Sequence, residues 1–444
     1  MTGTTQSLLA GILLLLCVAV VAQAAPPAAV DGNIAPVPQS EGGTPQPLTL
    51  PLALGRVMAA NPELAAARAA STAAEADARQ AGSFANPELS LEVENFAGSD
   101  TLRGFDGAET TLRLDQTFEL GGKRAQRRAI GTAAQAVARQ QQALAEGDLY
   151  VRTVAAFMGL LAAQERLQLA ESRVQLATRT RAGIQAQIDA GKSPNIAGIR
   201  SQPLLVEARL ERDRASGALE VARQELTALL DQESVTPLVV VGDLGALPEL
   251  PATGDGETRE TGAPQLALAA AAREQAAREL AGERLRAIPD VTLGLGLRRF
   301  EENGEHALVA GLSLPLPLFD RNRHGIAAAA ARLEQARSAE QSIRLTTAAA
   351  LRQATQEYQA RCDEARALRE ELLPAAQQSF EAVDYGYRAG KFGLLDLLDT
   401  QRQLGEVQSQ LLTAQVDCHV VAARLDTFRG RFPLLAGRAT LEKQ

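Results

Sequence analysis

Four segments of the chain alternate aliphatic residues with polar residues or glycine, and this period of two predicts β-strands with two different faces. The strands are expected at about residues 87–96, 109–118, 289–299 and 306–316. A transmembrane barrel strand needs about 9–11 residues of this pattern, apolar outward and polar inward. The aliphatic positions, which would then face lipid, are Leu89, Leu91, Val93, Leu112, Leu114, Leu293, Leu295, Leu312 and Leu314. A soluble hairpin packed on helices has the same pattern, so this alternative stays open.

The number of strands indicates how such a sheet could be completed. Four strands cannot close a barrel, and strand edges with unpaired backbone groups are not tolerated in lipid. Three copies of the chain would supply twelve strands, an even number that can close. We therefore expect a homotrimer around a twelve-strand barrel.

Two stretches predict very long helices. Residues 123–189 contain no proline, and at about 1.5 Å per residue a helix over them would be roughly 100 Å long. Residues 324–389 match them in the second half of the chain, with one proline at Pro374. Gly191 and Gly390 follow the two stretches, and glycine tolerates the left-handed geometry that ends a helix and turns the chain back. Each long helix is therefore expected to be followed by a returning one.

The helix expected after Gly390 carries a two-position heptad, which is typical of a coiled-coil seam. Its two positions hold Leu397, Leu404, Leu411, Cys418 and Leu425, and Thr400, Val407, Ala414, Val421 and Phe428. Aromatic residues are only 3% of the chain, which favours narrow seams of small side chains over a large core. The expected fold class is mainly α, with long coiled-coil helices and a membrane β-barrel part.

The two halves of the chain repeat each other with a shift of about 200 residues. Pro62-Glu63-Leu64 corresponds to Pro264-Gln265-Leu266, and Ala190-Gly191-Lys192 corresponds to Ala389-Gly390-Lys391. A repeat of this length predicts the duplication of a whole supersecondary unit. The expected divisions are a first repeat (48–230), a linker with one short strand (231–263), a second repeat (264–430) and a C-terminal tail (431–444).

The N-terminus predicts export. Leu8 to Val21 is one apolar run, followed by the small-x-small pattern Ala22-Gln23-Ala24 of a cleavage site. A signal peptide is expected at 1–24 and a flexible leader at 25–47, although the start of the chain lacks the usual basic residue. Cys17 follows Leu16 rather than a small residue, so no lipid anchor is expected. A buried N-terminal helix is the alternative.

Composition and motifs limit the chemistry. The net charge of −8 argues against nucleic-acid binding and is compatible with the passage of cations. The chain has no Walker motif, no Gly-x-Ser-x-Gly and no His-Glu-x-x-His, so neither an enzyme nor a cofactor is expected. His306, His324 and His419 cannot form a repeated high-affinity cluster, and no metal site is expected.

Four motifs resemble the TolC-like outer-membrane efflux proteins, in particular the CzcC-like branch that serves heavy-metal cation exporters. They are Asn86–Glu92, Phe118–Arg124, Leu316–Arg323 and Tyr387–Asp399, and the resemblance extends over about residues 48–430. It implies a trimeric twelve-strand barrel in the outer membrane of a Gram-negative bacterium, continued by a twelve-helix periplasmic tunnel. It also implies a periplasmic adaptor (membrane fusion protein) and an inner-membrane RND transporter as partners. A channel for drugs or other small molecules, or a periplasmic coiled-coil scaffold, stays as an alternative.

The same resemblance implies a gate at the periplasmic end of the tunnel. Tyr387 matches a tyrosine that ties neighbouring helices, and Asp396 and Asp399 match aspartates that ring the constriction. Threefold symmetry would turn each aspartate into a ring of three that favours cations. The sequence departs from the family at Phe392, where TolC has an arginine, and at Ala197, where the first turn has an aspartate. The alternative role of Asp396 is to stabilise the first turn of a helix.

The two glycine turns are also candidate docking points. Gly191-Lys192 and Gly390-Lys391 recur in both halves, so a trimer would present six similar tips to a hexameric adaptor. The alternative is that glycine and lysine simply end a helix well, glycine through its geometry and lysine through the helix dipole.

Two cysteines remain after the signal peptide. Cys362 lies 28 residues before Gly390 and Cys418 lies 28 residues after it. A hairpin folded at that glycine would bring them to a similar height, and the periplasm permits disulfides. A disulfide between them is therefore possible, while two buried free thiols are the alternative.

Overall fold

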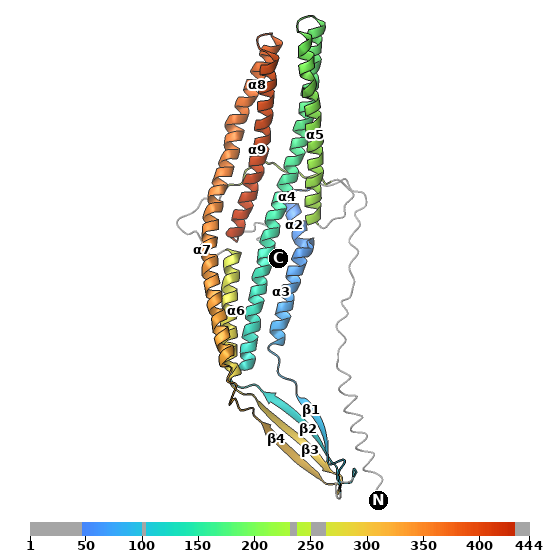
Figure 1. The fold of residues 1–444 in the computed structure, drawn as a ribbon, viewed down its shortest axis with the longest axis vertical. Helices are drawn as coiled ribbons and strands as arrows, with labels where there is room; N and C mark the ends of the chain where they lie inside the picture. Colours follow the sequence, from blue (N-terminus) through green and yellow to red (C-terminus); the bar gives the residue numbers. More distant parts are fainter. Residues whose placement is uncertain (1–46, 100–103, 231–237, 250–262, 431–444) are drawn as a thin grey trace, which may run out of the picture. The chain divides into compact units, whose positions relative to one another are not determined.

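A computed structural model describes residues 47–99, 104–230, 238–249 and 263–430 of the chain (Figure 1). The expected signal peptide at 1–24 and the tail at 431–444 lie outside the described residues, as do the leader apart from Pro47 and most of the linker. Within the described ranges, no helix is both long enough and apolar enough to span a membrane.

The strands form one antiparallel sheet in the order β1-β2-β3-β4 (Figure 1). Their bounds are Glu88–Glu94 for β1, Glu109–Phe118 for β2, Val291–Phe300 for β3 and His306–Ser313 for β4. The central pair, β2 and β3, joins the two halves of the chain, with Glu109 opposite Phe300 and Phe118 opposite Val291. In the single chain, β1 and β4 are therefore the outer strands of the sheet.

β4 is shorter than expected, because it ends at Ser313 rather than near residue 316. Pro315 and Pro317 lack the backbone N–H that a strand ladder needs. The segment from Leu314 to Phe319 consequently leaves the sheet before the next helix begins.

The helices of the first half pack along one long helix, α4 (Lys123–Asp189). α2 (Leu50–Ala60) and α3 (Pro62–Gln80) precede the sheet, α4 follows β2, and α5 (Asn195–Leu229) returns along α4 (Figure 1). α4 is a single α-helix of 67 residues, consistent with the absence of proline from this stretch. At the start of α3, Oδ1 of Asn61 accepts a hydrogen bond from the N–H of Glu63 at 3.0 Å, a side-chain cap of the helix.

The long helix of the second half contains a π-helical turn, which the expectation of one helix over 324–389 did not include. α6 (Pro264–Arg286) precedes β3, and α7 (Arg323–Ala367) passes through a π-helical turn (Leu368–Leu372) into α8 (Leu373–Arg388). Pro374 accounts for the π turn: proline has no N–H, and in a regular helix its ring clashes with the carbonyl four residues earlier. The wider π turn removes this conflict without ending the helix. α9 (Leu394–Phe428) then returns beside α8 and α7 (Figure 1).

The largest apolar cluster lies around the middle of α4. Phe157 and Leu160 of α4 pack with Val57 of α2 and with residues of the 238–249 segment, and all are nearly inaccessible to water. Leu48 pairs in parallel with Val240, which fixes this segment to the start of the first repeat. Elsewhere the helices meet in narrow seams such as the one between α6 and α7, where Ala276 and Ala329 belong to one small buried cluster. The low aromatic content fits this arrangement.

The heptad of α9 faces inward over most of its length. Its buried members are Leu397, Val407, Leu411, Ala414, Cys418, Val421 and Leu425. α9 contacts α4 as well as α7 and α8. At one such contact, Arg173 of α4 donates a hydrogen bond of 2.6 Å to the carbonyl of Gly405, and a Cβ at Gly405 would lie only 2.8 Å from that guanidinium. Glycine at this position lets the two helices approach each other.

Candidate functional site

One face of the sheet consists of exposed aliphatic side chains. Leu91 lies opposite Leu112, and Leu293 lies opposite Leu312, so the two hairpins present their leucines on the same side. All nine positions expected to face lipid are exposed, up to 71% for Leu312. A contiguous exposed apolar surface of this kind marks an interface with lipid or with another protein.

The opposite face of the sheet is charged. Near the loop end, Arg298 of β3 forms ion pairs with Glu94 of β1 at 2.9 Å and with Glu109 of β2 at 2.7 Å. Its Nε also donates to the hydroxyl of Thr111 at 3.0 Å. One guanidinium therefore ties three strands together on the polar face.

A second arginine on this face lies over glycines. Arg113 of β2 pairs with Asp115 at 2.7 Å. A Cβ placed at Gly294 or Gly311 would lie within 2.6 Å of the Arg113 side chain, so no larger residue fits beneath the guanidinium. These glycines therefore make room on the polar face for Arg113.

The sequence predicted the polar and glycine face but not the roles of Arg113 and Arg298. The sequence signal for these roles was the alternation of residue types along the strands. Glycines at alternate positions of one strand leave space for a long basic side chain on a paired strand. Which strands pair was not visible, since β2 and β3 are about 180 residues apart.

The two helix turns have the same backbone hydrogen bonds. Gly191 and Gly390 have φ angles of +68° and +74°, in the left-handed region that glycine adopts without strain. The N–H of the following lysine donates to the carbonyl five residues earlier, at 2.9 Å for Lys192 and 2.8 Å for Lys391. Both turns thus form the Schellman motif. Both lysine side chains are exposed beside it.

The three expected gate residues lie near the second turn. Asp396 is in the first turn of α9, where its Oδ2 accepts a hydrogen bond of 2.9 Å from the N–H of Gly393. Asp399 pairs at 3.0 Å with Arg402, and both side chains are largely exposed. Tyr387 is half-buried in the last turn of α8, and burial raises the pKa of its hydroxyl. Asp396 therefore caps α9, which leaves its second carboxylate oxygen available for another role.

The two departures from the family pattern, Phe392 and Ala197, both have apolar side chains. The ring of Phe392 lies against Gly386, where an added Cβ would come within 2.2 Å of it. Ala197 is half-buried in the first turn of α5, and its N–H donates to the carbonyl of Pro194 at 2.9 Å. Neither side chain can form a polar contact between turns.

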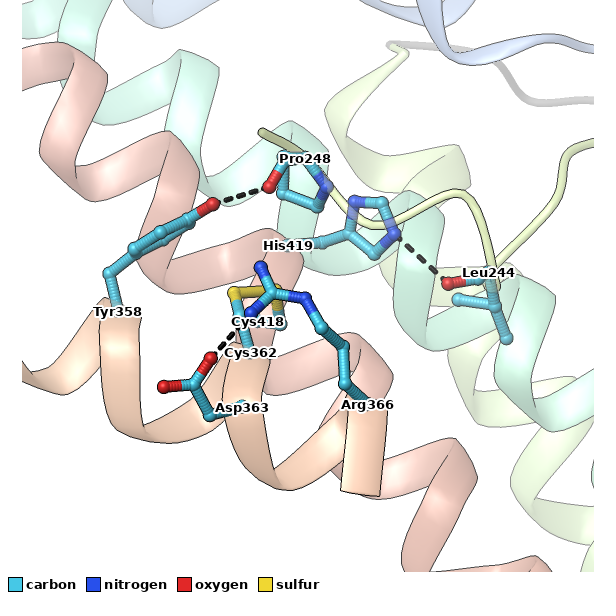
Figure 2. The surroundings of a disulfide bond; sticks show 8 residues. All are labelled: Leu244, Pro248, Tyr358, Cys362, Asp363, Arg366, Cys418 and His419. Carbon is cyan, nitrogen blue, oxygen red and sulfur yellow. Dashed lines mark hydrogen bonds and ion pairs between the residues drawn. A yellow bond between two sulfur atoms is a disulfide. The ribbon is translucent and has the colours of Figure 1, made fainter. Parts of the chain in front are cut away.

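Cys362 and Cys418 form a disulfide between α7 and α9 (Figure 2). The bond lies beside the segment at residues 243–248. Nε2 of His419 donates to the carbonyl of Leu244 at 3.2 Å, and the hydroxyl of Tyr358 donates to the carbonyl of Pro248 (Figure 2). A covalent bond therefore joins α7 to α9, and hydrogen bonds join both helices to the 243–248 segment at the same place.

Burial shifts the pKa of three further groups in the helical part. It lowers the pKa of His419, partly offset by the hydrogen bond to Leu244 and by the charge of Asp243. It raises the pKa of Glu165, to which the negative charge of Asp243 also contributes. Burial, with the charge of Asp426, raises the pKa of Tyr150 to about 12.

The histidines do not come together. His306 starts β4 and His324 is the second residue of α7, while His419 lies on α9. Among the residues that the structure describes, no three His, Cys, Asp or Glu side chains are grouped so that they could hold a metal ion.

The exposed apolar face, the charged opposite face and the long helix pairs define a protein of the outer membrane efflux class. The chain belongs to the outer membrane efflux protein family, whose model matches residues 53–232 and 260–431. The cobalt-zinc-cadmium resistance protein CzcC of Cupriavidus metallidurans is 30% identical over 385 residues, covering 87% of this chain and 90% of CzcC. The nickel-cobalt-cadmium resistance protein NccC of Alcaligenes xylosoxydans xylosoxydans is 32% identical over 292 residues, 65% of each chain. The family resemblance expected from the motifs is confirmed.

Solved structures with the same fold include CusC, whose crystal structures concern conformational changes that accompany folding and transmembrane channel formation. It matches with a TM-score of 0.73 at 18% identity, covering 89% of this chain and 96% of CusC. The outer membrane protein VceC of Vibrio cholerae matches with a TM-score of 0.67 at 20% identity, covering 86% and 96%. At these identities the likeness shows the fold alone.

Proposed function

We propose that this protein is the outer-membrane exit channel of a tripartite RND efflux system and that its cargo is heavy-metal cations. It works as a homotrimer in the outer membrane of a Gram-negative bacterium and extends into the periplasm, after export by the signal peptide expected at 1–24. It catalyses no reaction. The observation that carries the proposal is the sheet, with exposed leucines on one face and arginines, carboxylates and glycines on the other.

The trimer follows from the edges of this sheet. β1 and β4 are outer strands, and an open edge is not tolerated in lipid. With β1 of one copy beside β4 of the next, three copies close a barrel of twelve strands, leucines toward lipid and Arg113 and Arg298 toward the lumen.

The helices support a tunnel with a wall of twelve helical rods. Each copy contributes two long rods, α4 and α7–α8. It also contributes two rods that each consist of two shorter helices, since α3 and α5 both pack on α4, and α6 and α9 both pack on α7. The similar order of elements in the two halves supports an internal duplication.

The cargo is inferred from the relatives. CzcC is named for resistance to cobalt, zinc and cadmium, and NccC for resistance to nickel, cobalt and cadmium. The metal is a passing substrate and needs no resident site. A channel conducts ions faster when its contacts with them are weak and repeated, because tight binding would retain the ion.

The tips of the hairpins would hold the gate and the docking points. Asp399 and the free oxygen of Asp396 would form threefold rings that favour cations, and Tyr387 would tie adjacent helices. The exposed Lys192 and Lys391, on matching turns, would give a trimer six similar tips for a periplasmic adaptor, through which an inner-membrane RND transporter delivers the cargo.

Metal tolerance tests the proposed cargo. A strain from which this chain is deleted should grow less well on some of Zn, Co, Cd, Ni, Cu and Ag, and the wild-type chain should restore growth. The matched control is a chain with Leu91→Arg and Leu312→Arg, which should not restore growth because two leucines in lipid are replaced by charges. Unchanged tolerance to all six metals with raised sensitivity to dyes or detergents would instead identify a channel for organic compounds. Extraction of the mature protein without detergent would identify a periplasmic scaffold.

A further inference from the structure

We propose that the junction between the sheet and the helices binds anionic phospholipid headgroups of the membrane leaflet on the helix side. The inference rests on the proposed exit-channel function, since it assumes that the sheet lies in a membrane. We call the surface the junction collar. Its apolar members are Phe84, Phe118, Leu120, Ile288, Leu314, Leu316, Leu318 and Phe319, and its basic members are Arg124, Arg128, Arg321 and Arg323.

Strand pairing brings these residues to one end of the sheet. Phe118 at the end of β2 lies opposite Val291 at the start of β3, and Ser313 at the end of β4 lies opposite Thr292. β1 begins at Glu88, opposite Asp115. The segments that enter and leave the helices, 81–87, 119–123, 287–290 and 314–322, therefore all meet at this end, while the loops lie at the other.

The apolar members are unusually exposed. Phe319 is 101% exposed, Phe84 73%, Leu316 68% and Leu318 65%. These four side chains remain largely exposed to solvent in the single chain, although Phe84 has the guanidinium of Arg124 over its ring. Aromatic residues at the end of a lipid-facing surface are typical of the membrane–water interface.

Ion pairs neutralise only part of the charge at the collar. Lys123 pairs with Asp290 at 2.8 Å, and Arg127 pairs with Glu119. The four arginines of the collar have no carboxylate within ion-pair distance among the described residues. Arg124 instead lies over the ring of Phe84, 3.5 Å from its centroid.

The arginines at the start of α7 border a hollow. It has a volume of about 450 Å³ and is lined by Leu318, Phe319, Asp320, Arg321, Arg323 and His324. Its single carboxylate, on Asp320, accepts a hydrogen bond of 2.8 Å from the N–H of Asn322. With two arginines against one carboxylate, the hollow remains positive. It combines an apolar wall for an acyl chain with guanidinium groups for a phosphate.

The other end of the sheet has the opposite charge. The strand ends and the loop at this end carry Glu94, Glu109, Glu301, Glu302 and Glu305 around Arg298 and Arg299. Among the described residues, both arginines near the loop end are paired with carboxylates, whereas the helix end combines unpaired arginines with exposed aromatic rings. Anionic phospholipid is the occupant that matches both features, since each basic residue near an anionic membrane surface strengthens binding.

Native mass spectrometry of the full-length protein in neutral detergent tests the collar. The protein is titrated with phosphatidylglycerol and, separately, with phosphatidylcholine of the same acyl chains. We expect phosphatidylglycerol to bind more tightly, and Arg321→Gln with Arg323→Gln to weaken it about thirtyfold. Arg124→Gln with Arg128→Gln is the second variant. The matched control is Arg209→Gln with Arg352→Gln, which removes two exposed, carboxylate-free arginines from α5 and α7 far from the sheet. It should bind as the wild type does.

Further measurements separate the possible failures. Raising the salt from 0.1 to 1 M should weaken phosphatidylglycerol binding to the wild type, which needs no variant to fold. Equal binding of both lipids, or displacement of phosphatidylglycerol by inorganic phosphate alone, overturns the collar. Conductance of the wild type in phosphatidylcholine bilayers is scored separately. A protein that conducts but shows no lipid preference overturns the collar and keeps the channel, whereas one that never conducts overturns both.

Discussion

Cys362 on α7 and Cys418 on α9 lie at equal sequence distances from Gly390 and are joined by a disulfide, with 4.9 Å between their Cα atoms. The pairing means that α9 returns in register with α8 and α7, although the π turn lies between the cysteine and the tip. Cys418 occupies a heptad position, so the bond lies in the apolar seam with Val421 and Leu425. It closes the hairpin at its base and leaves the tip unbridged.

Removal of this disulfide should lower stability. The bond spans 56 residues, and loop-closure entropy for such a span corresponds to about 4 kcal/mol. Cys362→Ala with Cys418→Ala should therefore lower the melting temperature followed by circular dichroism at 222 nm. A reductant should lower it in the wild type and leave the variant unchanged. Two alkylated thiols per mature chain in denatured, unreduced protein would contradict the bond.

Charges on the two faces of the sheet should have unequal effects. Leu91→Arg or Leu312→Arg should cost about 2–4 kcal/mol near the bilayer midplane, because the arginine would face lipid. Glu92→Gln, the neighbouring position on the polar face, should change little. The fraction of assembled trimer in outer-membrane preparations measures both. Equal losses on the two faces would rule out a barrel.

Asp399 offers a clean test of the gate. Asp396 also caps α9, so its replacement would disturb the helix start. Asp399→Asn removes a charge from an exposed pair with Arg402 and should leave trimer stability nearly unchanged. The cation-to-anion permeability ratio, measured as a reversal potential in planar bilayers, should fall. In the double variant with Asp396→Asn the permeability ratio should fall further. An unchanged ratio in the double variant would exclude a charged ring.

The buried imidazole of His419 predicts a pH dependence of stability. Burial lowers its pKa, so below about pH 6.5 the unfolded chain takes up a proton that the folded chain resists. This contribution to stability is complete above that pH and should be lost progressively as the pH falls below it. His419→Gln keeps a donor toward Leu244 and should flatten this part of the profile. Glu165 acts in the opposite direction, since its raised pKa favours the folded state at low pH. A wild-type melting temperature constant over this range would contradict the role of His419.

Local pattern was enough to predict most elements. The alternation of Leu112, Arg113 and Leu114 indicated β2, and the proline-free stretch 123–189 coincides with α4. Gly191 and Gly390 marked the turns. These features depend on backbone preference and on side-chain period within a few neighbouring residues, which the sequence carries directly. The π turn before Pro374 is a matter of local geometry that periodicity does not show, since Pro203 lies inside the regular α-helix α5 without one.

Contacts between distant residues were decided only by the tertiary structure. The sequence alone determined the polar and apolar faces of the strands, the long helices and the family. It could not determine that β2 pairs with β3, that Arg113 lies over Gly294 and Gly311, or that four arginines at the junction have no carboxylate partner among the described residues. Equal spacing from Gly390 does not by itself determine the disulfide, because a shift of one helical turn would separate the cysteines. Such relationships depend on the relative placement of segments up to about 250 residues apart, which packing of the whole chain determines and local periodicity does not encode.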